Sequence, residues 1–232
     1  MKKKLIITAI GGLATVFLAW LWLRNRSNLM QTDAETSEQK FDKRIHTIKS
    51  QTQDINKLIA YSDAFVEMIF NQTISKAFSE SINLAVTQVN GCKLCIYAHT
   101  KYALEAGIKE EEVEFLLSGD FEHAPREQLE ALLFAQHYAE SEGNPDPVTK
   151  QKLFDTYGEE QANDIMSNIL IIMLANLHGN TIEAFKLRLK GQAVEESSFW
   201  QELGVIIGFF RIIPIIAYKI LNYKLRHGSI TW

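Results

Sequence analysis

The sequence has few cysteines, few prolines and no excess of positive charge. Two cysteines in 232 residues cannot cross-link a disulfide-rich secreted scaffold. A formal net charge of −4 excludes a strongly basic nucleic-acid binder, so no nucleic-acid partner is expected. Hydrophobic residues at 47% and charged residues at 22% exclude bulk disorder. Strand signals are almost absent, because no alternating run of five or more residues occurs.

Charge is unevenly distributed along the chain. Residues 1–26 carry five basic and no acidic residues, and residues 199–232 carry four basic residues and one acidic residue. Residues 27–198 therefore hold 15 basic and 27 acidic residues, a net charge of −12. An acidic middle between two basic, apolar ends is typical of a domain held at a membrane, because anionic headgroups attract Lys and Arg.

The N-terminal end contains a long uncharged run. Residues 5–23 lack any charge, and a helix of that length spans the hydrocarbon core of about 30 Å. A cleaved signal peptide has a shorter apolar core and a small-residue cleavage site, whereas this run ends in Trp-Leu-Trp-Leu followed directly by Arg24. We predict a single-pass transmembrane anchor over residues 1–26 and a polar tether over 27–40. The side of the membrane stays open.

The C-terminal end contains a second apolar run. Residues 203–221 are as long as a membrane span, but Arg211 lies near the middle, where a charge costs about 2.5–3.5 kcal/mol on insertion. Pro214 would kink a helix there. The preferred interpretation of residues 199–232 is an apolar, basic, membrane-associated helix that lies in the interface or re-enters it. A second span, or a helix packed against the core or another subunit, are the alternatives.

The middle of the chain has helical periodicity, so the predicted fold class is all-α, with a helical domain over residues 41–198. Breaks are expected at Gly107, at Gly119 and at the Gly-Asn-Pro-Asp-Pro cluster of residues 143–147. Residues 166–177 are apolar on most sides and are predicted to form the central helix. The predicted helices cover residues 42–60, 63–71, 74–89, 92–106, 109–118, 125–142, 148–157 and 159–189.

A dithiol motif lies at the start of one predicted helix. Cys92 follows a helix-breaking Asn-Gly pair, so we expect it at a helix N-terminus, where free N–H groups and the helix dipole favour a thiolate. Cys95 lies one turn further on the same face, and His99 follows four residues later. An imidazole can take or give the thiol proton near neutral pH. Glu80, on the preceding helix, can orient that imidazole if the two helices pack together.

Other interpretations of the motif stay open from the residues alone. The two cysteines can be buried structural residues. A Cys-Cys-His zinc site with Glu80 as fourth ligand is an alternative, although no second Cys/His pair is nearby. Haem attachment requires His directly after the second Cys, where Ile96 stands. A thioredoxin-like motif requires a β-α-β pattern, which is missing. We expect neither a metal nor an organic cofactor. The His-Gly-Asn segment at 178–180 is interpreted as a helix C-terminal cap, with a functional role near the thiols as the alternative.

The spacing Glu, eleven residues, CxxC, three residues, His resembles the alkylhydroperoxidase D (AhpD)-like group of the carboxymuconolactone decarboxylase superfamily. Flanking segments at 101–120, 125–139 and 158–180 are similar as well, so the resemblance covers roughly residues 50–190. The best-studied members carry a second His immediately before the second Cys, where this chain has Leu94. The family's true decarboxylases lack the cysteine pair.

The resemblance implies a compact all-α subunit that assembles into trimers or hexamers and reduces hydroperoxides through its dithiol. Cys95 would be attacked by the peroxide and become a sulfenic acid, and Cys92 would resolve it into a disulfide. His99 would act as general base and Glu80 would orient it. An external dithiol or thiol-disulfide protein would reduce the pair again. A non-catalytic, membrane-bound interaction or redox-sensing protein is the alternative function.

Overall fold

The structure is a computed structural model, and it describes residues 41, 43–192 and 194–227. The described residues from 43 onward form one compact unit. The predicted anchor over residues 1–26 and the tether over 27–40 lie outside the described residues. They remain predictions from the sequence.

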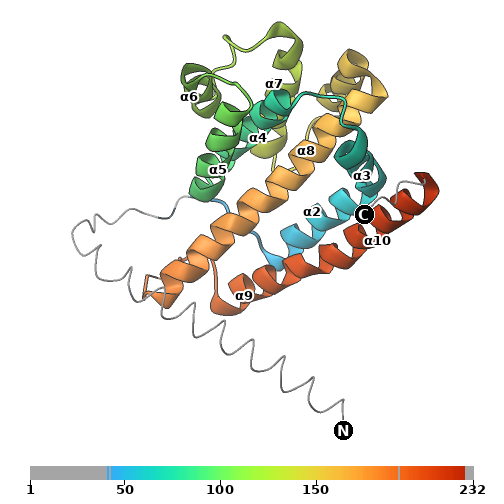
Figure 1. Cartoon of the computed structure of the whole chain (residues 1–232). Helices are drawn as coiled ribbons and strands as arrows, with labels where there is room; N and C mark the ends of the chain where they lie inside the picture. Colours follow the sequence, from blue (N-terminus) through green and yellow to red (C-terminus); the bar gives the residue numbers. More distant parts are fainter. Residues whose placement is uncertain (1–40, 42, 193, 228–232) are drawn as a thin grey trace. The chain divides into compact units, whose positions relative to one another are not determined.

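All the regular structure in the described part of the chain is helical, which confirms the all-α prediction (Figure 1). The first helix begins later than residue 42, because Thr47 and Ser50 form a reciprocal capping box that starts it at Ile48. The elements are α2 (Ile48–Ala60), α3 (Ser62–Asn71), α4 (Lys76–Asn90), α5 (Lys93–Glu105), α6 (Glu110–Ser118), α7 (Arg126–Glu140), α8 (Pro147–Leu189), α9 (Phe199–Gly208), the 3-10 helix η1 (Phe209–Arg211) and α10 (Ile212–His227).

Helices α4 and α8 lie side by side at the centre of the unit (Figure 1). Helix α4 also contacts α5, α6 and α7, and most of its residues are buried. Several of these buried residues are polar, among them Glu80, Asn83, Thr87 and Asn90. Thr87 and Asn176 hydrogen-bond each other across the two helices, which satisfies part of this polar interior. The predicted central segment, residues 166–177, lies within α8.

Helix α8 contains a kink at Gly158, whose φ of 72° and ψ of 172° interrupt the helical backbone. Glycine tolerates this positive-φ conformation, so a break is favoured at Gly158. The sequence predicted a break at this position, between helices ending at 157 and beginning at 159. The predicted cap at residues 178–180 is wrong. The helix continues through this segment to Leu189. Gly179 and Asn180 do not end it; they contact the cysteines and the carbonyl of Asn90 instead.

The last helices pack back onto the first ones. Helix α9 contacts α8 and α2, and α10 contacts α3 and α2 (Figure 1). Arg188 at the end of α8 forms an ion pair with the buried Glu202 of α9 at 2.9 Å. Gln51 Nε2 of α2 donates a 2.7 Å hydrogen bond to the carbonyl of Val205. Residues 199–227 therefore belong to the same packed unit as the helices before them.

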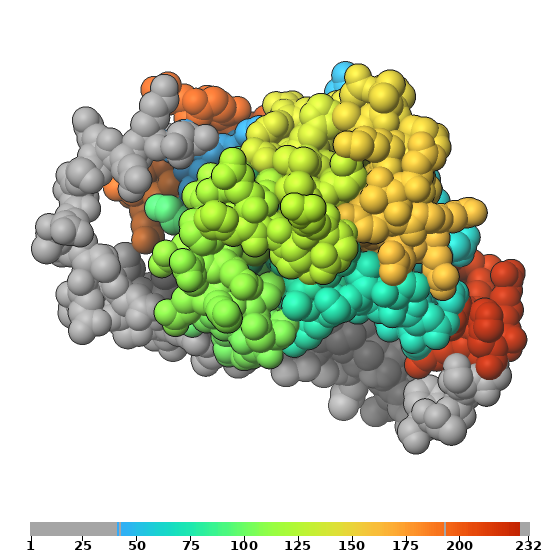
Figure 2. Space-filling model, turned by 90° about the horizontal axis from the view of Figure 1, so that it is seen from above, coloured from blue at the N-terminus to red at the C-terminus, as the bar shows by residue number. Residues whose placement is uncertain are grey.

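Two helices in the described residues are long and apolar enough to cross a membrane by length and composition. The first is α8, and 72% of its most apolar window is buried inside the protein, as expected of a core helix. The second spans Phe199–His227, and only 17% of its most apolar window is buried. In the view from above, α5, α6 and α7 cover one face of the unit, and α10 lies at an edge (Figure 2).

Candidate functional site

Glu80 and His99 meet across the α4–α5 interface. Glu80 Oε2 lies 2.7 Å from His99 Nδ1. A carboxylate can only accept a hydrogen bond, so His99 Nδ1 is the donor, and Nε2 then carries the lone pair. Both side chains are mostly buried, which strengthens this interaction relative to one in open water. The predicted orientation of His99 by Glu80 is present in the geometry.

Two neighbours outside the predicted motif, Asn83 and Tyr102, lie next to this pair. Asn83 Nδ2 lies 3.4 Å from Glu80 Oε2, on the same side of α4 one turn later. The ring of Tyr102 stands edge-on to the ring of His99 at a centroid distance of 6.0 Å. The spacing of three residues from Glu80 to Asn83, and from His99 to Tyr102, is the signal that could have indicated both.

Cys92 and Cys95 form a disulfide, with their Cα atoms 5.2 Å apart. Cys92 is the N-cap of α5, and its Sγ accepts a hydrogen bond from the backbone N–H of Cys95 at 3.3 Å. The side chain of Cys92 is buried, whereas Cys95 is partly exposed. In the reduced pair the helix N-terminus therefore stabilises negative charge on the Cys92 sulfur, and Cys95 is the more exposed of the two residues.

The turn before Cys92 is held by side chains from distant parts of the chain. Gly91 ends α4 with a φ of 66°, a conformation that favours glycine. Asn180 Nδ2 of α8 donates hydrogen bonds to the carbonyls of Asn90 at 2.8 Å and Arg44 at 2.9 Å. The guanidinium of Arg44 in turn donates to Asn90 Oδ1 at 2.7 Å. These bonds fix the position at which α5, and with it the dithiol, begins.

Helix α8 also forms the wall behind the sulfur atoms. A Cβ built on Gly179 would lie 2.9 Å from Cys92 Sγ and 3.6 Å from Cys95 Sγ. The first distance is shorter than a relaxed carbon–sulfur contact, so only glycine lets the helix approach this closely. Residue 179 lies 84 positions after Cys95, and no local sequence signal indicates that contact.

Helix α5 exposes most of its surface, and Ala103 is its one fully buried residue. Leu94, which stands where the family's second His is found, is 71% exposed, and Tyr97 is 73% exposed. Large exposed side chains, one aliphatic and one aromatic, therefore lie beside the dithiol on the outer face of α5. No group of three or more His, Cys, Asp or Glu side chains in the described ranges is arranged to hold a metal ion.

A cavity of about 210 Å³ opens between α4, α6 and α7, with Ser81, Phe115 and His123 among its lining residues. The four residues of the dithiol site do not line it. The ring of His123 stands edge-on to Phe115 at a centroid distance of 4.4 Å. This cavity is therefore separate from the place where a substrate would meet the thiols.

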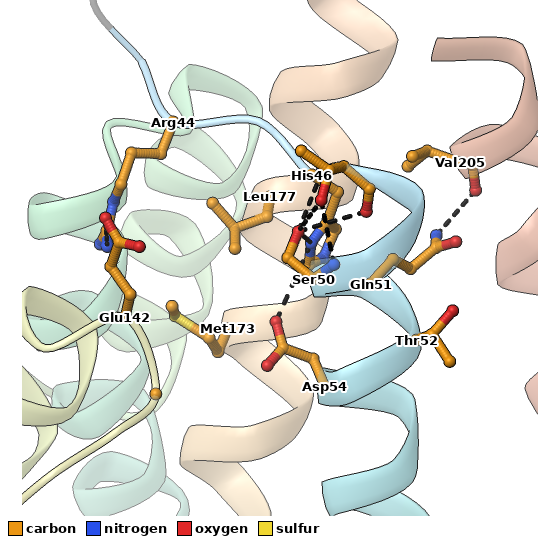
Figure 3. Close-up of polar contacts among 12 residues, drawn as sticks. Arg44, His46, Ser50, Gln51, Thr52, Asp54, Glu142, Met173, Leu177 and Val205 are labelled. Carbon is orange, nitrogen blue, oxygen red and sulfur yellow. Dashed lines mark hydrogen bonds and ion pairs between the residues drawn. The ribbon is translucent and has the colours of Figure 1, made fainter. Parts of the chain in front are cut away.

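A second polar cluster surrounds His46 at the start of α2 (Figure 3). The His46 ring is fully buried, with Nδ1 3.4 Å from Ser50 Oγ and 3.9 Å from Asp54 Oδ2. Burial lowers the pKa of His46 to about 4, and the charge of His178 acts in the same direction. Burial raises the pKa of the Asp54 carboxyl, although Lys57 opposes that shift.

The cluster does not form a Ser-His-Asp catalytic triad. Such a triad needs one imidazole nitrogen for the nucleophile and the other for the acid. Here Ser50 and Asp54 both approach Nδ1 of His46. Ser50 Oγ is also engaged by the backbone N–H of Thr47 in the capping box. The arrangement anchors the start of α2, and the dithiol site remains the better candidate for chemistry.

Comparison with known families identifies part of the chain. Residues 58–137 match the family model described as the Carboxymuconolactone decarboxylase family, which includes AhpD-like proteins. The match contains Glu80, Cys92, Cys95 and His99, and it confirms the resemblance drawn from their spacing. Gly179 and Asn180 lie outside it. No curated protein and no solved structure matches the chain.

Proposed function

From the match of residues 58–137 to the carboxymuconolactone decarboxylase family, we propose that the chain is a membrane-anchored, AhpD-like thiol peroxidase or disulfide reductase. The observation that carries the proposal is the 2.7 Å contact between Glu80 Oε2 and His99 Nδ1, one turn along α5 from Cys95. Together with the pairing of Cys92 and Cys95, this contact supplies a redox couple and an oriented base.

The proposed first step takes place at Cys95. His99 accepts the thiol proton through Nε2, and the Cys95 thiolate attacks the terminal oxygen of a hydroperoxide. The O–O bond breaks, the sulfur becomes a sulfenic acid, and the alcohol leaves with the proton that His99 returns. The carboxylate of Glu80 stabilises the imidazolium that exists between the two proton transfers. The partial exposure of Cys95 supports its assignment as the attacked residue.

The proposed second step takes place at Cys92. The Cys92 thiol loses its proton, its thiolate attacks the sulfur of the Cys95 sulfenic acid, and the S–O bond breaks. The leaving hydroxide takes up that proton and departs as water as the disulfide forms. The position of Cys92 at the N-cap of α5 favours the thiolate needed for this attack. An external dithiol or thiol-disulfide protein then supplies two electrons and two protons, which restores both thiols.

The partners in this proposal are a hydroperoxide, the external reductant, the membrane and further copies of the chain. The resemblance suggests trimers or hexamers, and sedimentation of the detergent-solubilised chain would measure the assembly. The uncharged run at residues 5–23 supports membrane anchoring. The dithiol itself is the redox group, so the proposed reaction requires neither a metal nor an organic cofactor.

The test uses the full chain, reduced completely and then mixed with cumene hydroperoxide. Intact mass and thiol titration follow formation of the Cys92–Cys95 disulfide. We expect loss of two thiols per chain, no disulfide in Cys95→Ser, and a rate lowered by about 10²-fold or more in His99→Gln. Glu80→Gln should slow the reaction less, because it acts through His99. The matched control is His123→Gln, an exposed histidine outside the site.

A non-catalytic, redox-sensing role is the second candidate, and the exposed Leu94 in place of an ionisable residue favours it. In that case the disulfide would form at the rate of an ordinary free thiol. The rate would then be the same in the wild type, His99→Gln and Glu80→Gln. Equal rates in these three proteins would therefore reject the peroxidase proposal and support the sensor.

A further inference from the structure

The helical segment Phe199–His227 carries an apolar stripe on its outer side. The segment has eight exposed large hydrophobic residues, of which Phe199 and Ile213 lie outside the stripe. The stripe consists of the other six: Trp200, Ile207, Phe210, Tyr218, Leu221 and Leu225. Spacings of seven residues (200 to 207, 218 to 225) and of three or four (207 to 210, 218 to 221, 221 to 225) place them along one side of a helix. A surface helix of a soluble protein has the reverse pattern, with polar residues outward.

The inner side of the same segment is fastened to the domain by polar contacts. Lys219 Nζ lies 2.8 Å from Asp63 Oδ1 of α3. The hydroxyl of Tyr223 accepts from Asn71 Nδ2 at 2.7 Å and donates to Glu67 Oε1 at 3.2 Å. A helix that left the domain to span a bilayer would carry Lys219 into hydrocarbon without its acidic partner, which is unfavourable.

The charges beside the stripe are all of one sign. Residues 203–227 contain four basic residues and no acidic residue. Lys219 is paired with Asp63, whereas Arg211 and Arg226 are exposed near the stripe. Long basic side chains beside an apolar surface place their charges at the level of lipid headgroups, while aromatic residues such as Trp200 and Tyr218 favour the same interface.

From this geometry we propose that α9, η1 and α10 lie flat on a bilayer containing anionic lipids, with the apolar stripe immersed in its surface. Two alternative binding partners for the stripe carry positive charge themselves and would be repelled. A second copy of this segment brings the same cations and no acid between residues 203 and 227, and residues 1–26 carry five basic and no acidic residues. Anionic headgroups complement the cations, and the acyl chains accept the apolar side chains.

This inference goes beyond the proposed function and does not depend on it. It adds a second, in-plane membrane contact to the anchor predicted at residues 1–26, so the helical domain would rest against the bilayer instead of extending from it on a tether. The docked face contains α9 and α10, while Cys92 and Cys95 lie on α5 of the same unit.

The test places the full chain in vesicles of 70% phosphatidylcholine and 30% phosphatidylserine that contain a photoactivatable phospholipid. Mass spectrometry then maps the residues that receive lipid adducts. We expect adducts on the stripe, and none on the inward-facing Ile212 and Tyr223. The double variant Leu221→Glu/Leu225→Glu should lose the adducts of the whole stripe. The control is Val148→Glu, which changes an even more exposed apolar residue, on α8.

The electrostatic part is tested separately. In Arg226→Gln, adducts on the stripe should fall by up to about fivefold, since one cation near an anionic surface contributes about that factor. In vesicles of phosphatidylcholine alone they should fall further, because none of the cations then meets an anionic lipid. Three results would overturn the proposal. These are adducts on both sides of residues 199–227, which indicate a span, adducts confined to residues 1–40, and cross-linked dimers whose stripe is unlabelled.

Discussion

Gly179 leaves the space that the sulfur of Cys92 occupies, because a methyl group at position 179 would lie 2.9 Å from Cys92 Sγ. The two residues come from α8 and from the N-cap of α5, and the contact joins the longest helix of the described unit to the candidate site. The close approach ties the position of Cys92 to the backbone of α8. It also makes the oxidised form sensitive to a single added carbon.

Gly179→Ala should therefore raise the reduction potential of the cysteine pair. The added Cβ disfavours the placement of Cys92 Sγ in the disulfide, whereas the reduced side chain can rotate away. We expect a shift of roughly 30 mV, a tenfold change in the equilibrium constant. Equilibration of the full chain with glutathione buffers, followed by alkylation and mass measurement, gives the potential.

The control for this change is Gly204→Ala on α9. It adds the same helix-favouring methyl group, but its nearest neighbour is the flexible end of the Ile48 side chain, far in the sequence from the cysteines. Its potential should equal that of the wild type. A Gly179→Ala potential within about 5 mV of the wild type, roughly a 1.5-fold change, would contradict the role given to Gly179.

Asn180→Ala should destabilise the fold and loosen the start of α5. The substitution leaves the carbonyls of Asn90 and Arg44 without the donor they share, and the site is buried. We expect the free energy of unfolding to fall by about 2 kcal/mol. Urea unfolding in a mild detergent measures it. Asn56→Ala, at an exposed position of α2, is the comparison, and an equal loss in both variants would argue against the clamp.

Stability should decrease between pH 7 and pH 5 because of His46. Its pKa is about 4 in the folded chain and 6.5 in the unfolded chain, so the unfolded state binds the extra proton in this range. The contribution of His46 is complete above pH 6.5 and is lost as the pH falls toward 4. The expected loss from pH 7 to pH 5 is about 2 kcal/mol.

The raised pKa of Asp54 acts in the opposite direction, because the folded state then binds its proton more readily than the unfolded state. Comparison of the wild type with His46→Gln separates the two groups. The variant should lose less stability on acidification than the wild type does. If the two pH profiles run parallel, His46 is not the group responsible.

Arg188→Ala should destabilise the chain more than Lys219→Ala. Glu202 is fully buried and would lose its charged partner, whereas Asp63, the partner of Lys219, is largely exposed to water. Thermal unfolding of both variants gives the ranking. In the double variant Arg188→Met/Glu202→Leu, removal of both charges should recover part of the stability. A double variant less stable than Arg188→Ala would exclude the unpaired carboxylate as the cause.

Much of the fold follows from local signals in the sequence. The breaks at Gly107, Gly119 and Gly158 were predictable because glycine tolerates positive φ better than other residues, and each of the three adopts it. The meeting of Glu80 and His99 was predictable because both lie on adjacent helices at a recognisable spacing. In these cases the residue and the structural reason lie within a few turns of each other.

Other features could not be predicted in this way. Helix α4 is central although its sequence is rich in polar residues, because Thr87 and Asn90 find partners on α8. Gly179 and Asn180 have the composition of a helix end, but their partners are about 90 residues away. Hydropathy and capping rules describe neighbours along the chain, and these contacts depend on which helices pack together.

Two separate contacts made by α8 restrict insertions and deletions in the stretch of helix between them. Gly179 faces the cysteines, and Arg188 forms the ion pair with Glu202 of α9. The two residues lie nine positions apart on a stretch of α8 that has no interruption. Each inserted or deleted residue between them would rotate one contact by about 100° relative to the other. Variation in length among related sequences should therefore be absent from residues 179–188.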